Sequence, residues 1–350
     1  MAKKNDEKKL NYGAEIRTLR ENGPQRLYLL WGQEDYLREC YLDELKALCL
    51  PDGDQSFSFK RLNGPTLDLR ELQDAIDAMP FLSDRSFVEL RGVELNQLKD
   101  AGERLVKILS DIPDYCTVAF VQDTGYEPDG RLKHIKAIRA QATELCFTRQ
   151  NQNDLTKWIA KRFAALGKGI DMDASQRLIF ISGDLMNRLI PEIEKVAAYA
   201  KGDKVTVSDV EAVANHIPEA YIFDMTDLIA QRKINNAFAI LAELLSDKNN
   251  EPIAMLAVLG IQMRRLYAAR LAVAQKLGVD YVREVCGCKY DFQATRLLQA
   301  ARGYTLPQLK RAVELCAEGD YRIKSSGQDE REIFKEVVVR IAAGECDGQH

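Results

Sequence analysis

The first residues that could carry chemistry form the turn Gly32–Asp35, which lies between two recognisable elements. The apolar run Leu27–Trp31 precedes the turn and predicts a buried strand, and the amphipathic pattern that follows, to Leu48, predicts a helix. In nucleotide-binding proteins such a unit carries a glycine-rich loop that ends in Lys-Ser or Lys-Thr. This turn has one glycine, no lysine and two carboxylates, which supply negative charge where a phosphate would lie. The sequence therefore predicts a nucleotide-type fold with a disabled phosphate site.

Carboxylates that could hold magnesium are also sparse. Glu89 stands alone within the third predicted strand, and Asp123 follows the fourth predicted strand with no second carboxylate beside it. Phosphoryl transfer depends on positioned charge that stabilises its transition state, and these residues offer no obvious source of that charge. An ATPase with an atypical phosphate loop is therefore kept only as an alternative interpretation.

Two cysteines, Cys286 and Cys288, could suggest a metal site. Tetrahedral zinc takes four ligands that usually come from paired motifs, and the spacing of one residue between these cysteines is poor for that purpose. The histidines lie far apart in the sequence, at His134, His216 and His350. We interpret the two cysteines as buried or half-buried thiols in a connection between helices, and we predict neither a metal nor a cofactor.

The composition predicts a cytoplasmic globular protein. The first nine residues, MAKKNDEKK, are charged and are not followed by the apolar core of a signal peptide. No apolar run approaches the roughly 20 residues that a membrane helix needs, so no membrane contact is expected. The eight cysteines are most simply reduced thiols of the cytosol. A net charge of −4 excludes a generally basic nucleic-acid binder, although a local basic patch stays possible.

Strand-like and helix-like segments alternate up to about residue 148, which predicts a parallel sheet covered by helices. The predicted strands are Leu27–Trp31, Ser56–Arg61, Ser86–Arg91, Thr117–Gln122 and Thr143–Phe147. The predicted helices between them are Glu34–Leu48, Leu67–Ala78, Leu95–Ser110 and Gly130–Ala140.

Beyond residue 151 only helices are predicted, so the fold class is α/β followed by all-α. Asn153 and Asp154 are expected to cap a first helix, and capping boxes are expected at Ser208 with Glu211 and at Thr305 with Gln308. Later apolar stripes predict helices at Phe223–Ala230, Ile234–Leu245, Ile253–Leu277, Tyr290–Ala301, Leu306–Lys324 and Glu332–Ala343. We expect three domains, at 1–150, 151–217 and 218–350.

The segment Pro80-Phe81-Leu82 places two large apolar side chains between a predicted helix and the third predicted strand. One interpretation is that both side chains pack under the sheet, as most hydrophobic loop residues do. The other is that they form an exposed apolar plug for the pocket of a partner protein, because adjacent large side chains are typical interface anchors.

Basic residues gather modestly in two places. The first group is Lys157, Lys161, Arg162 and Lys168, and the second is Arg264, Arg265 and Arg270. A solvated helix face explains either group. The alternative is contact with a nucleic-acid backbone, which would give a salt-dependent affinity, so a stand-alone DNA-binding protein is a second alternative function.

Several longer segments, taken together, resemble one family: the delta subunit of the bacterial DNA polymerase III clamp loader. The segments that carry the resemblance are Leu27–Leu37, Met79–Leu90, Gly183–Ala200, Ile222–Leu245, Glu251–Leu266 and Glu318–Gly327. No single motif is diagnostic, but their order and spacing extend over most of the chain. The sequence also lacks the phosphate loop and the Ser-Arg-Cys arginine-finger motif, as this family does.

The resemblance implies a degenerate RecA-type, AAA+-like sheet domain, a helical lid domain and a helical collar domain. It implies an accessory subunit without its own active site or cofactor, within a holoenzyme that is a DNA-directed DNA polymerase. The implied partners are the beta sliding clamp, the ATP-binding loader subunits (tau or gamma), delta prime and, through the complex, primed DNA. The AAA+-type ATPase remains the alternative.

The resemblance also implies a clamp-binding site. In the family a hydrophobic pair just before the third strand grips the clamp, and the matching residues here are Phe81 and Leu82, with Pro80 before them. Some members carry leucine and then phenylalanine, so the order is reversed in this chain. Lys157, Lys161 and Arg162 are the residues that we expect to contact DNA if the chain does so.

Overall fold

A computed structural model of the chain describes residues 10–50, 58–80, 83–98 and 101–345. These residues form two compact units. One unit comprises the chain up to Gln150 together with Leu185–Asn187, and the other comprises Asn151–Asp184 and the chain from Arg188 onward.

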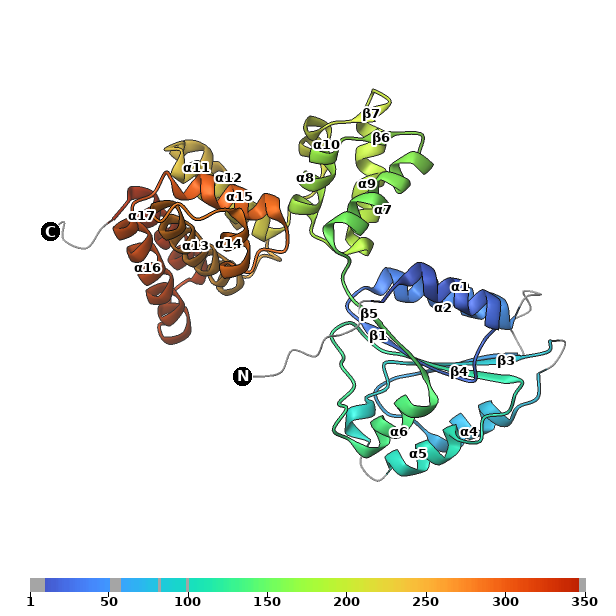
Figure 1. Ribbon diagram of the computed structural model, residues 1–350. Helices are drawn as coiled ribbons and strands as arrows, with labels where there is room; N and C mark the ends of the chain where they lie inside the picture. Colours follow the sequence, from blue (N-terminus) through green and yellow to red (C-terminus); the bar gives the residue numbers. More distant parts are fainter. Residues whose placement is uncertain (1–9, 51–57, 81–82, 99–100, 346–350) are drawn as a thin grey trace. The chain divides into compact units, whose positions relative to one another are not determined.

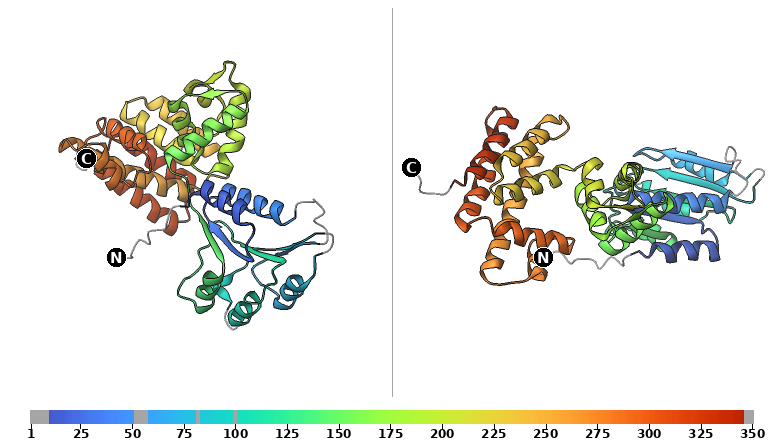
Figure 2. Two further views of the ribbon diagram at one scale, coloured as in Figure 1. Left: turned by 45° about the vertical axis from the view of Figure 1, so that its right-hand side comes forward. Right: turned by 90° about the horizontal axis from the view of Figure 1, so that it is seen from above.

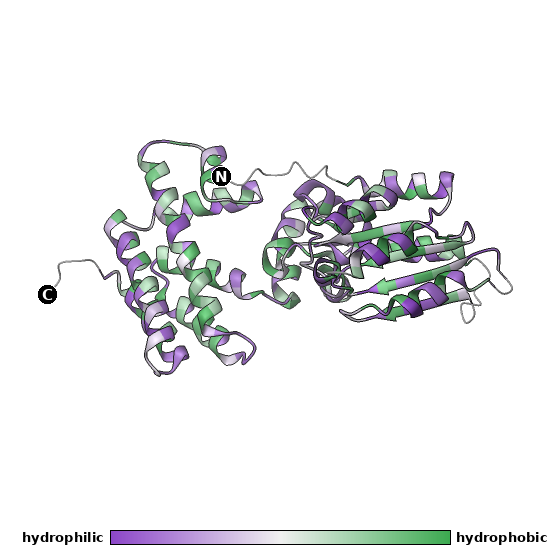
Figure 3. Cartoon of the chain, turned by 90° about the horizontal axis from the view of Figure 1, so that it is seen from below, coloured by the Kyte–Doolittle hydropathy of each residue, from purple (hydrophilic) through white to green (hydrophobic). Residues whose placement is uncertain are grey.

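The first unit is built on a parallel sheet of five strands in the order β2-β3-β4-β1-β5. The strands are β1 (Leu27–Gly32), β2 (Phe59–Asn63), β3 (Ser86–Arg91), β4 (Cys116–Val121) and β5 (Thr143–Phe147). The inner strands β1, β3 and β4 are almost entirely buried and mostly apolar (Figure 3), whereas most residues of the edge strand β2 are exposed. The predicted parallel sheet is confirmed.

Helices lie on both faces of this sheet (Figures 1 and 2). One face carries α1 (Tyr12–Asn22) and α2 (Asp35–Cys49), and the other carries α4 (Leu69–Asp77), α5 (Ala101–Leu109) and α6 (Lys133–Gln141). Side chains alternate between the two faces: Leu29 belongs to the core under α4, α5 and α6, whereas the ring of Tyr28 lies 6.3 Å from that of Tyr41 on α2.

Three details of this unit differ from the sequence prediction. Helix α1 was not predicted, because Leu19 is its only fully buried residue and the segment lacks an apolar stripe. Strand β2 begins at Phe59 rather than Ser56. The segment predicted as one helix from Leu95 is a short 3-10 turn, η1 (Leu95–Gln97), followed by α5, because Leu95 is buried in the sheet core.

The second unit begins with α7 (Gln152–Ala165), α8 (Met172–Ser182), α9 (Met186–Tyr199) and α10 (Val207–Val213). The prediction that strands stop after residue 151 is wrong, because β6 (Gly169–Ile170) and β7 (Lys204–Val205) pair in parallel. Two-residue strands are too short to give a sequence period, although Val205 is fully buried.

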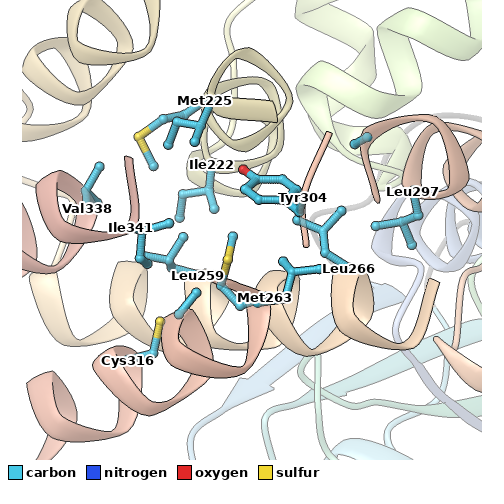
Figure 4. Packing of buried hydrophobic residues seen from close by; sticks show 14 of the residues in the cluster. Ile222, Met225, Leu259, Met263, Leu266, Leu297, Tyr304, Cys316, Val338 and Ile341 are labelled. Carbon is cyan, nitrogen blue, oxygen red and sulfur yellow. The ribbon is translucent and has the colours of Figure 1, made fainter. Parts of the chain in front are cut away.

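The rest of the second unit is helical, from α11 to α17. The helices are α11 (Pro218–Ala230), α12 (Ile234–Ser246), α13 (Pro252–Ala274), α14 (Val279–Val285), α15 (Asp291–Ala301), α16 (Leu306–Ser325) and α17 (Glu330–Ala343). Helix α14 was not predicted. Leu259, Met263 and Leu266 of α13 lie in the middle of the core, among side chains from the surrounding helices (Figure 4).

Of the helix caps predicted for this unit, one is confirmed and two are wrong. The capping box of Thr305 and Gln308 is confirmed at the start of α16. The box predicted at Ser208 and Glu211 is wrong, since Thr206 and Asp209 form it two residues earlier. Asn151, not Asn153 or Asp154, caps α7, and its side chain accepts the N–H of Asp154 at 2.8 Å.

Candidate functional site

The turn after β1 is closed by contact with β5. Gly32 has a φ of +127°, and a Cβ at this position would lie 2.4 Å from the backbone oxygen of Phe147. The backbone N–H of Glu34 donates to that same oxygen at 2.9 Å. Only glycine allows two backbone segments to approach so closely at this φ. The single glycine of the turn therefore serves strand packing.

The chain's own charged groups lie at the start of α2, where a phosphate would lie in a nucleotide-binding protein. Arg38 is buried and its Nη1 donates to the backbone oxygen of Gly32 at 3.1 Å. The carboxylate of Asp35 contacts both the Arg38 guanidinium and the hydroxyl of Thr124. Asp35 thus supplies the anion that a helix N-terminus favours. The arrangement supports the prediction that this turn is not a phosphate loop.

Glu89, the lone carboxylate of the third strand, is enclosed by cations. Lys46 Nζ lies 2.5 Å and Arg61 Nε lies 3.1 Å from its carboxylate, and Arg91 contacts it as well. Burial alone would raise the pKa of Glu89, but the hydrogen bonds from Lys46 and Arg91 outweigh burial and hold that pKa below its ordinary value. Glu89 is therefore the centre of an internal ion-pair network that joins α2, β2 and β3.

Of the predicted binding segment, Phe81 and Leu82 lie outside the described residues, and the structure describes only the residues on either side. Pro80 is half-buried. Met79, which follows α4, is 80% exposed. The sequence analysis did not assign a role to Met79, although its place beside Pro80 extends the apolar run by one residue.

The chain on both sides of this segment is held to the first unit by hydrogen bonds. The hydroxyl of Tyr115 donates to the backbone oxygen of Asp77, the last residue of α4, at 3.2 Å. Ser83 Oγ lies 2.6 Å from Ser58 Oγ and 2.9 Å from the backbone oxygen of Arg85. The short connection between α4 and β3 therefore starts and ends at fixed points.

The basic residues in and just after α7 differ in what surrounds their side chains. Lys157 and Lys161 are exposed and four positions apart, so they share a face of the helix. The guanidinium of Arg162 lies 5.4 Å from the ring centre of Trp158. Lys168 Nζ donates to the backbone oxygens of Ala200 and Gly202, at 3.0 and 2.7 Å. Within this group, Lys157 and Lys161 are the residues whose charge is exposed on one face of α7.

The second basic group does not form one surface. Arg264, Arg265 and Arg270 point to different sides of α13 at about 100° per residue. Arg265 Nε donates to the backbone oxygen of Cys286 at 2.9 Å, which joins α13 to the end of α14. We therefore do not assign this group to DNA.

Cys286 and Cys288 are both buried between α14 and α15, which confirms their interpretation as thiols in a helix connection. Burial raises the pKa of the Cys286 thiol to about 11. Within the described ranges, no group of three or more side chains is placed to hold a metal ion. Nor does any helix in that part of the chain have the length and apolar character to cross a membrane.

Comparison with known proteins identifies the family. A model of the DNA polymerase III delta subunit matches residues 28–148, and a model of that subunit's C-terminal domain matches residues 219–341. The chain belongs to the DNA polymerase III delta subunit family. It is 22% identical over 338 residues to DNA polymerase III subunit delta of Bacillus subtilis, covering 93% of this chain and 95% of the relative.

Two further matches agree with this assignment. A probable DNA polymerase III subunit delta of Aquifex aeolicus is 21% identical, with 90% of each chain covered. The solved structure of the Bacillus subtilis clamp loader delta protein matches with a TM-score of 0.54 and 18% identity, covering 95% of this chain and 99% of that one. The fold match confirms the predicted class of a parallel-sheet domain followed by helical domains.

Membership in the delta family connects the chain to DNA replication. It also implies that the chain works in a complex with other clamp-loader subunits.

Proposed function

We propose that this chain is the non-catalytic delta subunit of a DNA polymerase III clamp loader, which binds the beta sliding clamp, opens one of its interfaces and helps to load it on primed DNA. Family membership supports the assignment. The observation that carries the binding site is the apolar segment before β3, where Met79 is 80% exposed and the flanking chain is fixed.

In this proposal Phe81 and Leu82 enter a pocket of the clamp. Burying both side chains would remove on the order of 200–300 Å² of apolar surface, worth several kcal/mol at about 25 cal/mol per Å². Part of this free energy offsets the strain of an opened clamp interface, and part is lost to the entropy of association. The fixed ends of the connection reduce that loss, because less chain must be ordered on binding.

The chain acts without hydrolysing ATP in this proposal. The turn after β1 is filled by Arg38, Asp35 and the close approach of Phe147, which supports a subunit that uses no nucleotide of its own. Control then comes from partners that favour one arrangement of the assembly over another. We propose that these partners are the ATP-binding loader subunits and delta prime, and that the chain works in the cytoplasm.

The proposed domains are 1–150 for clamp binding, 151–217 as a lid and 218–350 as a collar for assembly. Lys157 and Lys161 are the residues of the lid that we propose for contact with primed DNA, with Arg162 beside them. Their shared exposed face on α7 supports the two lysines more strongly than Arg162.

The test compares the wild-type chain with the double variant Phe81→Ala/Leu82→Ala for binding to the immobilised beta clamp without nucleotide. We expect the variant to lose about 100-fold in affinity, which is about 2.7 kcal/mol. Met172→Ala, which truncates another exposed methionine (65%) far along the chain on α8, is the control and should bind like the wild type.

A double variant that folds normally by circular dichroism and binds the clamp with unchanged affinity would remove this segment as the grip. Calorimetry of the wild-type chain with ATP distinguishes the first alternative: we expect no saturable heat, whereas saturable ATP binding would support an ATPase. Tight, salt-sensitive binding of the isolated chain to primed DNA would support the stand-alone DNA-binding protein.

A further inference from the structure

Helix α13 is unusual among the helices of the second unit because it is apolar on nearly every side. Its first half, Pro252–Met263, contains no charged residue. A helix that is apolar all round is normally buried on all sides in a soluble protein. Helix α13 packs against α11, α15, α16 and α17, yet one side of it is open to solvent.

The open side is a continuous stripe, which we call the α13 stripe. It consists of residues at alternating steps of three and four positions: Ala254, Ala257, Ile261, Arg264, Ala268 and Leu271. All are exposed except Ala268, which is partly exposed. Ile261 is 42% exposed and Leu271 is 37% exposed. Steps of three and four place all six side chains along one line of the helix surface.

Helix α16 runs antiparallel beside α13 without covering the stripe. The Cβ position of Gly260 lies 3.5 Å from Cys316, whereas the Cβ position of Gly319 lies 3.1 Å from Leu256. Residues later in the sequence of α13 therefore contact residues earlier in the sequence of α16, as expected for antiparallel helices. Within the part of the chain that the structure describes, no helix packs over Ile261 or Leu271 closely enough to bury them.

The stripe has the form of a helix-docking surface. Alternating steps of three and four are the spacing at which two helices interlock their side chains. The three alanines allow a second helix backbone to approach closely, and Ile261 and Leu271 supply larger side chains to pack against it. From Ala254 to Leu271 the stripe is about 26 Å long at 1.5 Å per residue, enough for almost five helical turns.

The charge at the centre of the stripe indicates which kind of helix could bind there. Arg264 lies near the midpoint, and no ion pair or hydrogen bond joins its guanidinium to another described residue. In a symmetric pairing of two copies through this stripe, antiparallel or in parallel register, the two Arg264 side chains would face each other. Like charges at such a position are destabilising, so a second copy is disfavoured and a helix with a carboxylate is favoured.

We propose that the α13 stripe is the docking surface for an α-helix of another clamp-loader subunit, and that this helix places an Asp or Glu opposite Arg264. The inference rests on the proposed function, because it takes the partner to be a loader subunit. It adds to that function the surface of the C-terminal helices that makes the contact and the charge that sets the register.

The test uses the full chain carrying Ile261→Asp/Leu271→Asp, mixed with the ATP-binding loader subunit and delta prime, with assembly followed by sedimentation velocity. We expect at least a tenfold loss of affinity for the complex. Val339→Asp, on α17 and 41% exposed, is the matched control and should assemble like the wild type. Arg264→Ala should weaken assembly and make it less sensitive to salt.

Binding to the beta clamp is measured on the same variants and should stay unchanged, so that failure of the stripe is distinguished from failure of the clamp-binding proposal. If the aspartate variant does not fold, Ile261→Gln/Leu271→Gln replaces it with the same expected direction. Normal assembly of a folded stripe variant would overturn the inference. So would a dimer of the wild-type chain alone that the stripe variant abolishes, because the occupant would then be a second copy.

Discussion

Asp224 and Asp227 of α11 lie close to the same guanidinium, but their pKa values shift in opposite directions. Asp224 accepts from Arg177 at 2.9 Å and from Arg296 at 2.7 Å, whereas Asp227 is paired with Arg296 at 2.5 Å. Burial would raise both pKa values. Two guanidinium groups outweigh burial at Asp224 and lower its pKa, but at Asp227 burial wins and the pKa is raised.

We predict that Asp224→Asn lowers the free energy of unfolding at pH 7 by about 2 kcal/mol, because it removes charge-assisted hydrogen bonds from a mostly buried site. The pKa of Asp224 is lower in the folded state, so its stabilisation is present above the ordinary pKa of an aspartate and disappears as pH falls through the folded value. Urea unfolding at pH 7 and at about pH 3 measures this.

Asp227→Asn is the matched control and has the opposite sign of linkage. Its raised folded pKa means that ionised Asp227 is penalised by folding above its ordinary pKa, and that this penalty is removed as pH falls. We predict that Asp227→Asn costs less stability at pH 7 than Asp224→Asn does. An equal or larger loss at Asp227, or an effect of Asp224→Asn that does not shrink at low pH, would contradict this account.

At the scale of elements, the closed turn after β1 depends on one glycine. Gly32 ends β1 at a φ of +127° and Gly64 directly follows β2 at a φ of +116°, but of these two only Gly32 has backbone atoms where a Cβ would lie. We predict that Gly64→Ala costs about 1–3 kcal/mol from backbone strain alone. Gly32→Ala should cost about 1–3 kcal/mol more, because it also clashes with β5.

Thermal unfolding of the two glycine variants tests this difference. A larger fall in Tm for Gly32→Ala is the expected result. Equal falls would mean that the contact between the turn and Phe147 relaxes without cost, and that the turn is looser than the structure indicates.

The elements also show what a sequence can reveal. Strands β1, β3, β4 and β5 could be predicted to within a residue or two, because each is a short, mostly apolar run between helical patterns, and glycine or proline lies near the ends of the first three. Helices α1 and α14 could not, because one buries little apolar surface and the other has only seven residues. The caps of α7 and α10 were misplaced by two residues, since several cap-forming residues stand close together in each sequence.

Some parts of the candidate site could be predicted from the sequence, and others required the fold. The disabled phosphate turn follows from residue types alone, whereas Arg38 as the residue that contacts Gly32 depends on the fold, because helical spacing brings it back toward the turn. Phe81 and Leu82 stay predictions, since both lie outside the described residues. The α13 stripe could not be identified from its sequence, because a helix apolar on all sides gives no sign of which side is open.

At the scale of the whole molecule, the basic face of α7 makes a prediction about DNA. Lys157→Glu/Lys161→Glu should weaken binding of the assembled loader to primed DNA and reduce the slope of log affinity against log salt by about two, one for each phosphate contact. Lys335→Glu, on α17, is the control. An unchanged salt slope in the double variant would assign the DNA contacts to other residues or other subunits.

In the proposed function, a subunit without a working phosphate site grips and opens the clamp through residues 80–82. Fluorophores placed on both sides of a beta-clamp interface report opening as a loss of self-quenching. We predict that the wild-type chain opens the clamp without ATP and that Phe81→Ala/Leu82→Ala does not, while Met172→Ala opens it normally. Opening that requires ATP, or that persists in the double variant, would contradict the account.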